Sequence, residues 1–132
     1  MRIIVSFFIG LILITGCSQS VGNNAKSRAE ATHNPTAEEV LTQNADADIF
    51  QFQGIVYENA DHVDWVQQEK LTSGERVGKI TKPYQEGLPF EDGMATKLPE
   101  GAEIFEPAKK SGPVLIVKWS GNEKRYLGLL EG

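Results

Sequence analysis

The sequence contains a single cysteine, Cys17, among its 132 residues. No disulfide can form within one chain, so a folded domain has to be held together by its hydrophobic core. Histidine is almost as scarce, with only His33 and His62. With only two histidines, the chain has few candidate residues for a histidine-based catalytic site or a zinc site.

Basic residues are also in deficit: the chain has 13 Lys and Arg against 18 Asp and Glu, a formal net charge of −5. Only Lys109-Lys110 and Lys124-Arg125 form basic pairs, and both fall in expected turns, where solvated side chains are usual. Nucleic acid binding depends on clustered positive charge that neutralises phosphates. The composition therefore argues against a nucleic acid partner.

Long apolar runs are absent except at the amino end, where residues 3–14 follow Arg2. As a helix, these roughly 12 residues would span about 18 Å, well short of the roughly 30 Å of hydrocarbon in a bilayer. A charged start followed by a short apolar segment is typical of a secretory signal peptide. Residues 1–16 are therefore predicted to be removed as a signal peptide.

The apolar run ends in Ile14-Thr15-Gly16-Cys17. This sequence resembles the lipobox of bacterial lipoproteins, in which an aliphatic residue and two small residues precede an obligatory cysteine. The resemblance implies that Cys17 is joined to diacylglycerol and becomes the first residue of the mature protein. Two acyl chains of about 15 buried methylenes each would then hold it with on the order of 20 kcal/mol. The alternative is an ordinary secretory signal that has a cysteine at this place by chance.

Residues 18–48 contain no aromatic residue and are rich in Ser, Asn, Ala, Gln, Thr and Glu. Such a composition is typical of a flexible tether, with a reach of about 30 Å for about 30 residues. Within it, Thr36-Ala37-Glu38-Glu39 fits a capping box that would start a short helix over residues 36–41. Because so short a helix is marginal alone, it is either transient or docked on the following domain. We assign residues 17–48 to the lipidated cysteine and tether, and residues 49–132 to a small β-rich domain.

In residues 49–132, short apolar stretches and turn signals alternate at spacings of about 8–12 residues. The pattern predicts a mainly β (α+β) fold, an antiparallel curled sheet or partly open barrel with one helix. The six expected strands cover residues 49–57 with a bulge at Gly54, 76–81, 94–98, 102–106, 114–119 and 125–130. Residues 94–98 and 102–106 are expected to form a hairpin, and the strongly apolar stretch 114–119 the central strand.

The one substantial helix is expected over residues 61–71. Its apolar stripe is formed by Val63, Val66 and Leu71. Trp65 lies off this stripe, so its burial is less expected than that of Trp119, which ends the most apolar strand.

Three segments of the domain stand out: Gly54-Ile55-Val56-Tyr57, Val77-Gly78-Lys79-Ile80 and Ala95-Thr96-Lys97-Leu98-Pro99-Glu100-Gly101. Through them, the chain from Asp48 onward resembles the C-terminal domain of small uncharacterised lipoproteins of Gram-positive, bacillus-like bacteria. The resemblance brings no known activity with it.

The sequence has no motif for a phosphate-binding loop, a nucleophilic serine elbow or a zinc protease. His62 is the sole candidate base, since His33 lies in the expected tether. A metal site of His62 with Asp61 and Asp64 is disfavoured, because residues in one helical turn point in different directions. We therefore expect neither a metal nor a cofactor.

The longest loop, residues 83–93, holds two prolines, two glycines and two aromatic residues. Its acidic pair Glu91-Asp92 is a candidate for carboxylate catalysis, although adjacent acids in a loop are usually solvated. Tyr84, Leu88 and Phe90 are better candidates for binding, because loops on a rigid scaffold commonly carry binding residues. In the alternative interpretation, these three side chains fold back and cover an open end of the barrel.

The leading hypothesis is a lipoprotein anchored at the extracytoplasmic face of the cell membrane, with a small non-enzymatic binding domain. Its partners would be the membrane, through the lipid on Cys17, and another envelope protein or a wall component. One alternative is a small hydrolase that modifies the cell wall through Glu91, Asp92 or His62. Another is a structural or stress-related envelope protein.

The substitution Cys17→Ala is expected to leave the protein without lipid and uncut at residue 17, because the cysteine sulfur is the acceptor of the lipid. Metabolic labelling with a tagged fatty acid, together with the mass of the mature chain, checks this. Label in the variant, or a mature chain that begins elsewhere, would contradict the lipobox interpretation.

Overall fold

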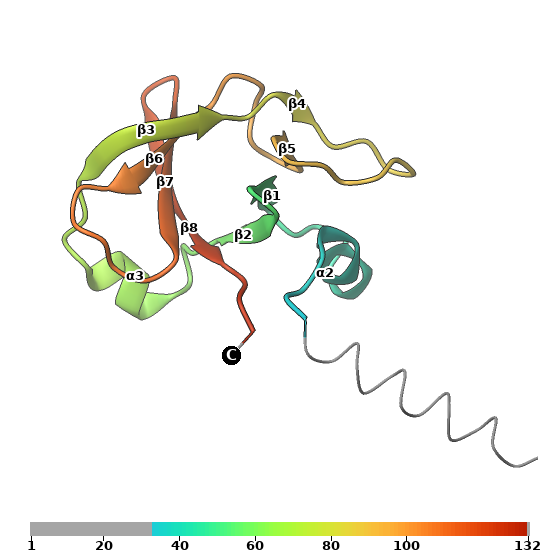
Figure 1. The fold of residues 1–132 in the computed structure, drawn as a ribbon, viewed down its shortest axis with the longest axis horizontal. Coiled ribbons are helices and arrows are strands. Elements are labelled where there is room, and N and C mark those ends of the chain that lie inside the picture. The colour runs from blue at the N-terminus through green and yellow to red at the C-terminus, as the bar shows by residue number, and fades with distance from the viewer. Residues whose placement is uncertain (1–32, 132) are drawn as a thin grey trace, which may run out of the picture. The chain divides into compact units, whose positions relative to one another are not determined.

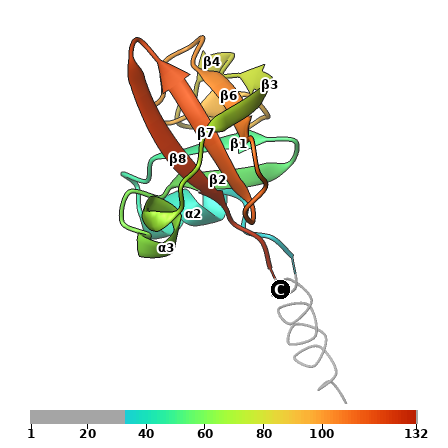
Figure 2. The ribbon, with the colours of Figure 1, turned by 90° about the vertical axis from the view of Figure 1, so that its left-hand side faces the viewer.

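A computed structural model of the chain describes residues 33–131. These residues form one curled, open half-barrel sheet with two short helices, so the predicted mainly β class is confirmed (Figures 1 and 2). The expected signal peptide, Cys17 and the first part of the expected tether lie outside the described residues. Within residues 33–131, no helix has the length and apolarity needed to cross a membrane.

The sheet has eight strands rather than the expected six. They are β1 (Ile49–Phe52), β2 (Ile55–Asn59), β3 (Ser73–Lys79), β4 (Lys82–Pro83), β5 (Met94–Ala95), β6 (Glu103–Pro107), β7 (Val114–Trp119) and β8 (Asn122–Gly128). Their order across the sheet is β3-β6-β7-β8-β2-β1-β5-β4. Only β4 and β5 pair in parallel. The helices are α2 (Ala37–Gln43) and α3 (Asp64–Gln68).

The first predicted strand is in fact a hairpin, because the expected bulge at Gly54 is a turn. Gln53 and Gly54 connect β1 to β2 with φ angles of 52° and 80°. Two successive residues of positive φ are typical of the type I′ turn, whose twist matches that of a hairpin. Ser120 and Gly121 make the same kind of turn between β7 and β8, with φ angles of 45° and 80°.

The predicted hairpin of residues 94–98 and 102–106 does not form. β5 is only two residues long and pairs with β1 and β4, whereas β6 pairs with β3 and β7. The cause is Thr96, whose hydroxyl donates to the carbonyl of Ala47 (2.7 Å) and accepts from the amide of Ile49 (3.0 Å). These bonds draw the chain after β5 onto the start of β1.

The two edge strands of the sheet, β3 and β4, are consecutive in the chain. Only Ile80 and Thr81 separate them, and Ile80 is fully buried. The chain thus leaves one edge and joins the other within two residues, which requires the sheet to curl. Phe52 of β1 packs closely against the backbone of β3 at Gly78. A Cβ atom on Gly78 would lie only 2.7 Å from the Phe52 ring.

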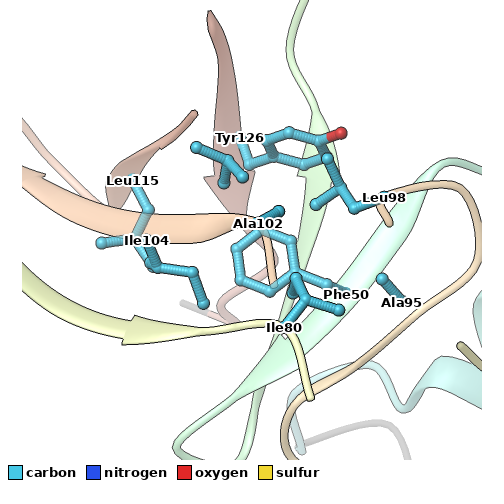
Figure 3. Close-up of a cluster of buried hydrophobic side chains, with 9 residues drawn as sticks. Phe50, Ile80, Ala95, Leu98, Ala102, Ile104, Leu115 and Tyr126 are labelled. Atoms are coloured by element: carbon cyan, nitrogen blue, oxygen red, sulfur yellow. The ribbon is translucent and has the colours of Figure 1, made fainter. Parts of the chain in front are cut away.

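The main core lies inside the curl, where side chains of β1, β5, β6, β7 and β8 meet those of the connecting segments (Figure 3). The buried members are Phe50, Ile80, Ala95, Leu98, Ala102, Ile104, Leu115, Val117 and Tyr126. The predicted central strand is confirmed, since β7 lies between β6 and β8 and its first four residues are buried.

The helix expected within the tether is present as α2, and it is docked on the sheet. Its capping box is complete: the Glu39 amide donates to the Thr36 hydroxyl, and the Thr36 amide to the Glu39 carboxylate. Ala37 is fully buried in a second cluster that includes Ile49 and Phe90. The compact unit therefore begins at Asn34 and includes residues that the sequence assigns to the tether.

The other helix, α3, is shorter than the predicted span of residues 61–71. It starts late because the Asp61 amide donates to the Asn59 side chain in a local turn (2.7 Å). At the carboxyl end of α3, the Arg125 guanidinium donates to the Glu69 carbonyl at 2.9 Å. This carbonyl thus has a partner without a further turn of helix. The predicted apolar stripe packs as expected, with Val66 buried and Val63 and Leu71 beside it.

Gly93 and Gly87 form a matched pair for testing the packing of the loop before β5. Both have a φ that L residues rarely adopt, 91° and 92°. A Cβ atom on Gly93 would lie 2.4 Å from the Thr81 hydroxyl oxygen, whereas one on Gly87 would meet nothing within 4 Å. Gly87→Ala should cost about 1–2 kcal/mol of strain, and Gly93→Ala about 1–3 kcal/mol more. Equilibrium urea unfolding measures both, and equal costs would contradict the packing at Thr81.

Candidate functional site

The loop between β4 and β5, residues 84–93, is fixed to the domain through two carboxylates. The Phe90 amide donates to the Glu38 carboxylate of α2 at 3.1 Å. The Asp92 carboxylate accepts from the amide of Gly54, in the turn between β1 and β2, at 3.0 Å. The loop is therefore held from two sides, as a binding loop on a rigid scaffold would be.

The structure places the three predicted binding residues in different environments. Phe90 is only 8 % exposed and folds back into the cluster under α2. Tyr84 is half-buried and stacks on Phe90, with ring centroids 4.6 Å apart and an interplanar angle of 25°. Leu88 is 49 % exposed. Leu88 is thus the large apolar side chain that this loop exposes to solvent, and Tyr84 is partly exposed.

A hollow of about 350 Å³ lies beside Tyr84 and is lined by α2 and the chain after it, by the loop, and by the two residues after β5. We call it the Tyr84 hollow; Leu41 and Tyr84 give it an apolar wall, and Glu86 and Lys97 give it charges of opposite sign. A concave surface with apolar walls and a few polar groups is typical of ligand sites.

A second hollow, of about 390 Å³, opens between the β1–β2 turn and the segment that joins β6 to β7. We call it the Leu130 groove; Ile55, Tyr57, Pro113 and Leu130 supply apolar surface, and Glu106 and Lys110 supply charge. Burial and, secondarily, the Glu106 carboxylate raise the pKa of the Tyr57 hydroxyl. The hydroxyl therefore stays a hydrogen-bond donor to a higher pH than that of an exposed tyrosine.

No family model, curated protein or solved structure matches this chain.

A third hollow, of about 330 Å³, is acidic and includes Asp48, Asp61 and His62. Two of its carboxylates are engaged by the protein itself: Asp48 accepts from the Tyr126 hydroxyl at 3.0 Å, and Asp61 pairs with Lys124 at 2.7 Å. Among residues 33–131, no three His, Cys, Asp or Glu side chains are grouped so as to hold a metal ion. The disfavoured site of His62, Asp61 and Asp64 is not assembled in this part of the chain.

The residues of the hydrolase alternative do not share any of the three hollows described above. His62 lines the acidic hollow, which contains neither Glu91 nor Asp92. Asp92 accepts from the Gln51 side chain and the Gly54 amide, each at 3.0 Å, and so ties the loop to the β1–β2 turn.

The Leu130 groove is not predicted by the sequence pattern. Alternation along β2 could have indicated part of it, because Ile55 and Tyr57 lie on the opposite face from Val56, which packs toward α2. No local signal places Pro113 and Leu130 beside them, since these contacts join segments distant in the chain.

Proposed function

We propose that this protein is a binding module anchored by lipid at the extracytoplasmic face of the membrane through Cys17. The anchor is supported by Ile14-Thr15-Gly16-Cys17, which follows an apolar segment too short to span a bilayer. The expected partner is another envelope protein or a wall component. Such a partner would reach the domain from the aqueous side of the membrane.

The observation that carries the binding proposal is the exposed Leu88 on a loop that the rest of the domain holds in place. Leu88 is as exposed as any large apolar side chain described, at 49 %. Because Glu38 and Asp92 already fix the loop, little conformational entropy is lost when a partner covers it. Tyr84 and its hollow lie in the same loop and extend the surface.

The hydrolase alternative receives less support from the geometry. Glycoside hydrolysis needs two carboxyl groups on either side of the scissile bond. Asp92 is instead a hydrogen-bond acceptor for the β1–β2 turn, and His62 lies in a different hollow from Glu91 and Asp92. This arrangement favours binding over catalysis at the loop.

Leu88→Ser in the intact lipoprotein should lower recovery of the partner after cross-linking in membranes. Burying a half-exposed leucine contributes about 1–2 kcal/mol, so affinity should fall about tenfold. Leu130→Ser is the matched control, because Leu130 has the same exposure of 49 % and lines the Leu130 groove, which includes no residue of this loop. Both variants should unfold within about 0.5 kcal/mol of the wild type, as surface substitutions usually do.

Equal recovery by wild type and Leu88→Ser would contradict a role for this loop, as would equal losses in both variants. Phe90→Ala is unsuitable for this comparison, because removing its buried ring should cost about 3–5 kcal/mol of folding stability.

A further inference from the structure

Trp65 and Leu130 are two of the three large apolar side chains exposed in the described part of the chain, at 46 % and 49 %. They belong to one surface, because a Cβ atom on Gly112 would lie 3.4 Å from the Trp65 ring, and Gly112 lines the Leu130 groove. We call it the Trp65–Leu130 surface and include the adjoining Lys109 and Lys110.

The chain toward Cys17 leaves the folded unit beside this surface. Asn34, the first residue of the unit, accepts a hydrogen bond from the Glu131 amide at 2.8 Å, one residue after Leu130. Cys17 and Asn34 are 17 residues apart in sequence, so a fully extended chain places them at most about 60 Å apart. In Figure 1, α3 and the carboxyl end lie along the lower side of the domain, whereas the loop between β4 and β5 projects to the right.

The chemistry of the surface suits the boundary between lipid and water. A tryptophan ring is apolar and carries one N–H donor, a combination enriched where hydrocarbon meets headgroups. Lys109 and Lys110 are exposed and form no ion pair among residues 33–131, so they are available to anionic headgroups. Three acidic side chains oppose that attraction: Glu106 lines the groove, Glu131 follows Leu130, and Glu69 accepts a hydrogen bond from Ser111 at 3.2 Å. The apolar side chains should therefore dominate the contact.

We propose that the Trp65–Leu130 surface rests on the phospholipid surface of the membrane that holds the lipid on Cys17. This inference depends on the proposed anchor and adds an orientation to it. With Trp65 and Leu130 on the membrane, Leu88 and the Tyr84 hollow remain open to a partner.

Depth-dependent fluorescence quenching tests the contact. In Trp119→Phe, Trp65 is the sole tryptophan, since the chain has only two. The mature lipidated variant, reconstituted in vesicles with brominated acyl chains, should lose most of its emission relative to vesicles of ordinary lipid. Adding Leu130→Ser should restore much of that emission, whereas adding Leu88→Ser should not.

Three outcomes would overturn the inference. If the protein stays on the vesicles but Trp65 is quenched no more than Trp119 in Trp65→Phe, the anchor stands and the contact is wrong. If the protein separates from the vesicles, the anchor proposal fails as well. If Leu130→Ser abolishes capture of an envelope protein without changing the quenching of Trp65, the surface binds protein instead of lipid.

A second variant tests the same membrane contact without a substitution at Trp119. Leu130→Cys can be labelled with an environment-sensitive dye, because the only natural cysteine, Cys17, would carry lipid. Dye emission should shift to shorter wavelengths on vesicles. An unchanged spectrum on vesicle-bound protein would overturn the contact independently.

Discussion

The hydrogen bond between the Tyr126 hydroxyl and Asp48 is the interaction on which the rest of the domain depends. Strand β8, which carries Tyr126, joins β3-β6-β7 on one side to β2-β1-β5-β4 on the other. Tyr126 is 1 % exposed and lies with Phe50 in the main core (Figure 3). The two rings meet edge to face at 5.1 Å, and the Tyr126 hydroxyl lies 3.0 Å from Asp48. A buried hydroxyl without an acceptor costs about 1–3 kcal/mol. Tyr126 on β8 therefore favours the conformation in which Asp48 lies beside its hydroxyl.

Asp48 lies between α2 and β1, so the same hydrogen bond positions the elements that carry the proposed binding surface. Burial and the nearby charge of Asp48 raise the pKa of Tyr126, so its hydroxyl stays a donor to a higher pH than that of an exposed tyrosine. With Asp48 in place, α2 packs beside β1 and its Glu38 holds the amide of Phe90. The core thus determines how firmly Leu88 is presented, although Leu88 itself is largely exposed.

The sequence predicted features that depend on neighbouring residues and failed where distant residues decide. The capping box at Thr36 and the burial of β7 follow from local hydrogen bonding and apolar content. The pairing of β5 depends on Thr96 meeting Ala47 and Ile49, which are more than 40 residues away. In the loop, the pattern predicted the same binding role for Tyr84, Leu88 and Phe90. The burial of Phe90 depends on the docking of α2, which composition does not predict.

A double-mutant cycle on Tyr126 and Asp48 tests most directly whether this hydrogen bond holds the two parts of the sheet together. The free energies of unfolding of Tyr126→Phe, Asp48→Ala and the double variant would be measured against wild type in urea. A hydrogen bond to a charged group should give a coupling of about 1.5–3 kcal/mol, with Asp48→Ala the costlier single change because it strands a buried hydroxyl. Additive costs, within about 0.3–0.5 kcal/mol, would contradict the account.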